Sequence, residues 1–136
     1  MIMKLLFTFG ILFFLLTGIN AQIDTSCIIL KDGKLTQVFK NGNTATIVNP
    51  DGTHSIAVKN GNISTIIHPN GTHSNIVQTG NIFTIIHPNG THSTGIKNGN
   101  SSTIVNANGT HSTVIDNGAT SVVVNPDGTH SVIIKN

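Results

Sequence analysis

Seven histidines are the residues of this chain best suited to site chemistry: His54, His68, His73, His87, His92, His111 and His130. Imidazole binds zinc or copper and changes charge near neutral pH, so repeated histidines suggest a metal array or a pH sensor. Five recur at 19-residue intervals and are the candidate metal ligands: His54, His73, His92, His111 and His130.

In a sheet of hairpins, neighbours in that series would lie two strands, about 9.6 Å, apart. That spacing exceeds what a shared ion allows, because zinc–nitrogen bonds are about 2.0–2.1 Å. We therefore interpret the histidines first as strand residues copied with the repeat. Weak metal binding and pH sensing are the alternatives.

Catalysis finds little support among the other reactive residues. Asp51 and Asp127 occupy positions where other units carry Asn, and Asp116 stands where other units carry Lys or Gln. The sequence places no two carboxylates together as an acid–base pair would require, and Cys27 lies outside the clear repeats. We therefore expect no enzymatic activity and no cofactor.

The histidine series belongs to a tripeptide, Thr-His-Ser, that recurs five times with a period of 19 residues. The hydroxyls flanking each His point to one face of a strand, about 7 Å apart. They form a candidate binding face: Thr53, Ser55, Thr72, Ser74, Thr91, Ser93, Thr110, Ser112, Thr129 and Ser131. The pattern resembles the Thr-x-Thr arrays of β-solenoid ice-binding proteins, which implies a flat hydroxyl surface if the units stack as coils.

Each unit contains two stretches of about seven residues rich in Thr, Val and Ile, as at 43–49 and 53–59. Branched side chains suit a pleated sheet, and no apolar period of 3.6 residues follows residue 21. Such a strict period predicts a repeat architecture made entirely of strands.

Two kinds of turn separate the strands. Asn49-Pro-Asp-Gly52 predicts a type I turn whose Gly takes the left-handed conformation of a bulged hairpin. Asn60-Gly61 and its copies predict two-residue type I′ hairpins. This register places His54 opposite both Val48 and Ile67, and His73 opposite both Ile67 and Ile86.

The expected fold is an antiparallel meander of about ten to twelve strands, built from 19-residue β-hairpin units. Adjacent apolar residues such as Ile47 and Val48 make each face half apolar, so the sheet must close into a barrel, fold into two layers or pair with another copy. The alternative is a two-sided β-solenoid with one unit per coil. Antiparallel pairing of 62–68 with 72–78 would decide between them.

The first 21 residues differ from the rest. Lys4, the apolar run of residues 5–16 and a small residue at Ala21 predict a cleaved signal peptide over 1–21. A lead-in segment of residues 22–30 and a β-repeat domain of residues 31–136 follow, the latter opening with a degenerate repeat at 31–42. The protein is therefore expected to be secreted and extracellular, with no membrane association after cleavage.

The charge of the remaining chain is nearly balanced and includes no Arg, which argues against nucleic-acid binding. Cys27 is a candidate for an intermolecular disulfide, or alternatively a thiol without a partner. Five sequons make the protein a candidate glycoprotein: Asn62, Asn70, Asn89, Asn100 and Asn108.

Together these features predict a secreted, non-enzymatic repeat protein with a structural, self-associating or surface-interaction role. The alternative is a binding module that presents the Thr-His-Ser face to ice, glycan or metal.

Overall fold

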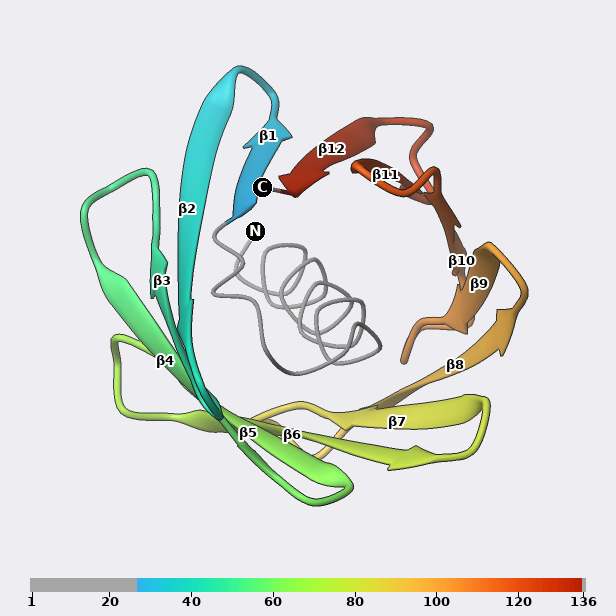
Figure 1. Ribbon diagram of the computed structural model, residues 1–136. Coiled ribbons are helices and arrows are strands. Elements are labelled where there is room, and N and C mark those ends of the chain that lie inside the picture. The colour runs from blue at the N-terminus through green and yellow to red at the C-terminus, as the bar shows by residue number, and fades with distance from the viewer. Residues whose placement is uncertain (1–26, 136) are drawn as a thin grey trace.

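The computed structural model describes residues 27–135, which form twelve strands (Figure 1). The predicted signal peptide and residues 22–26 of the predicted lead-in lie outside this range. The strands are β1 (Cys27–Lys31), β2 (Lys34–Asn41), β3 (Thr44–Val48), β4 (His54–Asn60), β5 (Ile63–Ile67), β6 (His73–Thr79), β7 (Ile82–Ile86), β8 (His92–Asn98), β9 (Ser101–Val105), β10 (His111–Asp116), β11 (Thr120–Val124) and β12 (His130–Lys135).

Each strand pairs antiparallel with the strands before and after it in sequence, and β1 pairs with β12 to close a barrel. Ile63 lies opposite Val77 and Ile67 opposite His73, so the segments that decide the architecture are antiparallel neighbours. The meander prediction is confirmed, and the solenoid alternative is wrong. The barrel begins at Cys27, within the segment predicted as a lead-in.

Proline-type turns join the strands at one end of the barrel. In the first, Gly52 N–H donates to the Asn49 carbonyl at 2.9 Å, and Asn49 N–H donates to the Thr53 carbonyl at 2.8 Å. Gly52 has a φ of 83°, the left-handed conformation that the sequence predicts. The same bonds recur in the next three units and the last, so this turn prediction is confirmed.

The turns at the other end differ from prediction. Asn60 pairs with Ile63, which leaves Gly61 and Asn62, rather than Asn60 and Gly61, as the two-residue loop. Gly61 has a φ of 60°, and Asn62 is not among the described residues with positive φ. Glycine at the first loop position is the pattern of a type II′ turn, whereas type I′ requires two positive φ values. The type I′ prediction is therefore wrong here.

This change shifts the register of every Gly-Asn hairpin by two residues. Ile67 lies opposite Ile56 rather than His54, and Ile86 lies opposite Asn75 rather than His73. A shift of two preserves which face each side chain occupies. The predicted division of residues between the two faces therefore survives, although the predicted rows do not.

Replacing Gly90 by Val is expected to lower the free energy of unfolding by roughly 1 kcal/mol or more. Gly90 has a φ of 84°, and a Cβ added there would meet no atom within 4 Å, so the cost arises from backbone strain alone. Thermal or denaturant unfolding measures it. An unchanged melting temperature would contradict the turn geometry.

Closure gives the sheet an inner and an outer face. Apolar side chains of moderate size line the middle of the inner face and are buried, including Ile47, Ile66, Ile85, Ile104 and Val123. Ser55, Ser74, Ser93, Ser112 and Ser131 lie opposite or beside them and are equally buried. The inner face therefore carries the core, although half of that layer is hydroxyl-bearing.

Candidate functional site

The Thr of each Thr-His-Ser tripeptide stabilises a proline-type turn. Thr53 Oγ1 donates to Asp51 Oδ1 at 2.6 Å, and the Thr53 N–H donates to the same oxygen at 2.9 Å. Equivalent pairs join Thr72 to Asn70 and Thr91 to Asn89. Local bonds of this kind favour a turn over a continued strand. The turn therefore accounts for the recurrence of Thr.

The Ser of each tripeptide points into the barrel. His68 Nε2 lies 2.9 Å from Ser74 Oγ, and His87 Nε2 lies 2.8 Å from Ser93 Oγ. In the fourth full unit Asn106 takes the place of His, and its Nδ2 lies 3.4 Å from Ser112 Oγ. The ten-residue candidate face is thus divided between turn-binding Thr and buried Ser, and its binding role stays a prediction.

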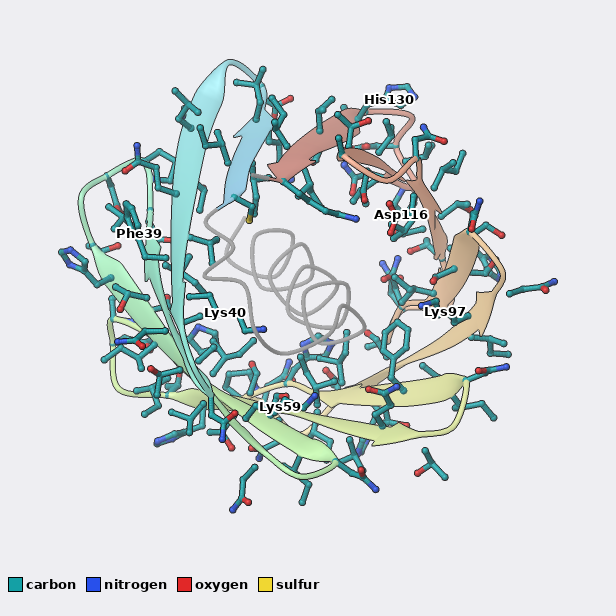
Figure 2. The ribbon with its side chains drawn as sticks, viewed as in Figure 1. Phe39, Lys40, Lys59, Lys97, Asp116 and His130 are labelled. Atoms are coloured by element: carbon teal, nitrogen blue, oxygen red, sulfur yellow. The ribbon has the colours of Figure 1, made fainter. Side chains whose placement is uncertain are left out.

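The five periodic histidines point outward and are exposed: His54, His73, His92, His111 and His130. His130 lies at the outer rim of the barrel (Figure 2). Within residues 27–135 no three His, Cys, Asp or Glu side chains gather closely enough to hold a metal ion. The remaining two histidines, His68 and His87, face inward and are buried.

Micromolar zinc is expected to leave the melting temperature almost unchanged. The periodic histidines lie on alternate strands, and no third ligand stands beside any pair of them in the described chain. A ligand that binds only the folded state would raise the melting temperature by linkage. Differential scanning calorimetry with zinc and with a chelator checks this, and a rise of many degrees would reinstate the metal hypothesis.

Acid is expected to destabilise the barrel through its two inward histidines. Burial lowers the pKa of His68, and His73 lowers it further; His87 is affected in the same way by burial and by His92. The unfolded chain therefore takes up more protons, so the free energy of unfolding falls as pH drops below about 6.5.

The repeat supplies a matched variant for this pH prediction. Asn49, Asn106 and Asn125 occupy the positions of His68 and His87 in other units. The double variant His68→Asn/His87→Asn should therefore fold and should lose part of the difference in melting temperature between pH 7.5 and pH 5. An equal pH dependence in the variant would assign the effect to other groups.

Cys27 faces inward on β1, opposite Lys135 and Val38, and is 1% exposed. Burial raises the pKa of its thiol to about 12, against a smaller lowering by Lys135. Thiolate is the reactive form, so this cysteine is protected while the barrel is folded. An intermolecular disulfide stays a prediction.

The outer face of the barrel carries no Lys, Arg, Asp or Glu on any of the twelve described strands. Its apolar side chains are widely exposed: Leu30, Leu35, Phe39, Ile56, Val58, Ile63, Ile82, Ile96, Val105, Ile115 and Ile134. Phe39 stands on this outer wall in Figure 2 and is 51% exposed. The polar side chains between them are mostly Thr, Asn and His, with Gln37 on β2 and Ser101 on β9.

The charged residues of the strands face inward. Six positions spaced by 19 residues surround the mouth of the barrel at its Gly-Asn end: Lys40, Lys59, Gln78, Lys97, Asp116 and Lys135. Lys59 lies opposite Ser64 and Lys97 opposite Ser102, and both serines are buried on the inner face. Figure 2 shows Lys40, Lys59 and Lys97 directed into the barrel. We call these six residues the mouth ring.

The sequence shows the period of the mouth ring, but sequence reasoning assigned no site to it. The signal that could have found it is the concentration of Lys at one repeat position.

In residues 27–135, no helix is long and apolar enough to cross a membrane. Comparison of the chain with protein-family models, curated proteins and solved structures finds no match.

Proposed function

We propose that this protein is a secreted, non-enzymatic barrel that acts by association through its outer wall. The observation that supports this role is the absence of charge from the outward positions of the strands, together with widely exposed Leu, Phe, Ile and Val. Soluble monomers rarely expose large continuous apolar surfaces, and such surfaces mark sites of interaction. Self-association is the form of this role that we favour.

Closure changes the route by which copies would associate. An open meander would have two free edge strands, and each could pair with a strand of another chain. In residues 27–135 β1 and β12 pair with each other, so strand addition is not the favoured route. Side-by-side contact of outer walls needs no change in the barrel. Thr, Val and Ile give that wall the composition of a sheet surface suited to packing.

The alternative binding module would use the Thr-His-Ser repeat. The Ser of each unit is buried, and the Thr hydroxyl, although at the surface, is bonded to the side chain of the neighbouring turn residue. The five histidines point outward from the wall. Ice or glycan binding through a flat hydroxyl face is therefore less well supported than association of the walls.

Sedimentation of the purified protein, with and without reductant, tests the proposal. We expect the average mass to rise with concentration in both conditions. The variant Ile56→Lys/Ile96→Lys places two charges on the wall and should remain a monomer, because burying an isolated charge is costly. The control Ala107→Lys/Ala119→Lys adds the same charges at exposed turns and should associate like the wild type.

A mass that stays monomeric at every concentration would reject self-association. Association that disappears with reductant would assign assembly to Cys27 rather than to the wall. Equal behaviour of the wall variant and the turn control would also count against the wall as the interface.

A further inference from the structure

Several Asn residues of this chain are followed directly by Gly, and the structure places these pairs in different kinds of turn. The pairs are Asn41-Gly42, Asn60-Gly61, Asn70-Gly71, Asn89-Gly90, Asn98-Gly99, Asn108-Gly109 and Asn117-Gly118. An Asn-Gly pair is chemically labile, because glycine has no side chain to hinder its own backbone nitrogen from attacking the Asn side chain. All the pairs share this local chemistry, so the fold decides which of them react in the folded protein.

The reaction consumes water and needs no enzyme. The Gly nitrogen loses its proton and bonds to Cγ of the Asn side chain, and the Cγ–Nδ2 bond breaks to release ammonia. Water then opens the resulting succinimide ring at either carbonyl, which leaves aspartate or isoaspartate. Hydrogen bonds that hold the Gly N–H or the Asn side chain oppose the reaction, because they must break first.

The Asn-Gly pairs of the proline-type turns are held by three hydrogen bonds each. Gly71 N–H donates to the His68 carbonyl at 2.9 Å. Asn70 Oδ1 accepts the Thr72 N–H at 3.1 Å and Thr72 Oγ1 at 2.7 Å. The same three bonds recur in the next two units. Both the attacking nitrogen and the side chain that it must reach are therefore fixed in these turns.

Three other pairs, which we call the open pairs, have none of these bonds. Each begins a two-residue loop at the end of a strand: Asn41-Gly42 after β2, Asn60-Gly61 after β4 and Asn98-Gly99 after β8. Their Gly N–H groups donate to no group within residues 27–135, and their Asn side chains are exposed and make no hydrogen bond in that range. The remaining pair is partly held, because Gly118 N–H donates to Asp116 Oδ1 at 3.0 Å.

We propose that the open pairs are sites of spontaneous deamidation, and that the proline-type turns protect the Asn-Gly pairs within them. The Asn of each open pair is the last residue of its strand, and the lysine before it faces inward (Figure 2). Because side chains alternate along a strand, the Asn side chains face outward. Deamidation would therefore place carboxylates on outward strand positions, which carry no charge in the described chain.

The experiment follows the purified protein over days in a mildly alkaline buffer, once folded and once in guanidinium chloride. Tandem mass spectrometry of its peptides measures the conversion of each Asn. In the folded protein the open pairs should react roughly tenfold or more faster than Asn70, Asn89 and Asn108, since several bonds must first open in the turns. In guanidinium chloride the rates of all the pairs should converge.

Two results would overturn the proposal. One is equal rates at the open pairs and the proline-type turns of the folded protein. The other is open pairs that stay intact while the denatured chain reacts. A difference that persists in guanidinium chloride would also count against it, because the difference would then belong to the sequence rather than to the fold.

Thr72→Val tests whether the turn bonds protect Asn70. The substitution removes the hydroxyl that donates to Asn70 Oδ1, at an exposed position, and keeps a similar shape. It should speed conversion of Asn70 severalfold and leave Asn89, in the next unit, as an internal control at its wild-type rate. An unchanged rate at Asn70 would contradict protection by these bonds.

Asn60→Thr/Asn98→Thr removes two of the open pairs. Thr79 precedes Gly80 at the same repeat position, so the variant should fold. On ion exchange the aged variant should accumulate fewer acidic forms than the wild type, with Asn41 as the main remaining site. Equal accumulation in both proteins would place the reaction elsewhere and reject the assignment.

Discussion

Gly95→Val is expected to destabilise the barrel by about 3 kcal/mol or more, because it forces a side chain into space already filled by Phe83. The two residues are opposite each other on β8 and β7, and both are buried on the inner face. A Cβ built on Gly95 would overlap the ring atoms of Phe83. This glycine is therefore required for its lack of a side chain rather than for backbone freedom.

A second substitution should rescue the first. Ser102 and Val114 form the equivalent pair in the next unit, so Phe83→Ser/Gly95→Val reproduces a combination that the barrel already holds. Phe83→Ser alone should cost about 3–5 kcal/mol through lost burial. The double variant should be more stable than the sum of the single changes implies. Denaturant unfolding of all four proteins measures the coupling, and strictly additive losses would contradict direct packing of the two residues.

Ile29→Pro is expected to open the barrel, which makes it the second change of large effect. Ile29 lies at the centre of β1 and is paired with Ile133 on β12 and Thr36 on β2. Proline removes a backbone donor and its ring disfavours a central strand, at a cost of about 3 kcal/mol or more. The separated strands would then present free edges, which template aggregation.

Circular dichroism and light scattering of Ile29→Pro should show a lower melting temperature and concentration-dependent aggregation. Ile29→Val is the control, since it keeps the donor and most of the buried surface, and it should lose only about 0.5–1.5 kcal/mol. A soluble proline variant with wild-type melting would mean that the β1–β12 junction contributes little to stability.

Local sequence signals predicted most of the fold. The Thr, Val and Ile stretches became strands, and the Pro-containing turns formed with Gly in the left-handed conformation, because both depend on neighbouring residues alone. The Gly-Asn turns were misassigned because the run Asn60-Gly61-Asn62 can supply a two-residue loop in two ways, as Asn60-Gly61 or as Gly61-Asn62. Which of the two loops forms depends on the register between strands across the whole sheet.

Two features could not be predicted from local sequence signals: the pairing of β1 with β12, and the choice of which face of the sheet becomes the interior. Pairing of β1 with β12 joins residues from opposite ends of the described chain, and Cys27–Lys31 carries little trace of the repeat. Closure also decides which face becomes the interior. Only then are the serines hidden, the histidines displayed and the lysines gathered at one opening.

The ring made by β1 and β12 also restricts how this gene could change its copy number. A linear solenoid grows by adding units at an end, and its earlier units keep their neighbours. Here each 19-residue unit contributes two of twelve strands, so adding or deleting one changes the circumference. Inner side chains such as Ile66 and Phe83 would then face a cross-section of different width. Duplication of a single unit would therefore change the packing of every other unit, so the curvature of the barrel constrains the number of repeats as much as function does.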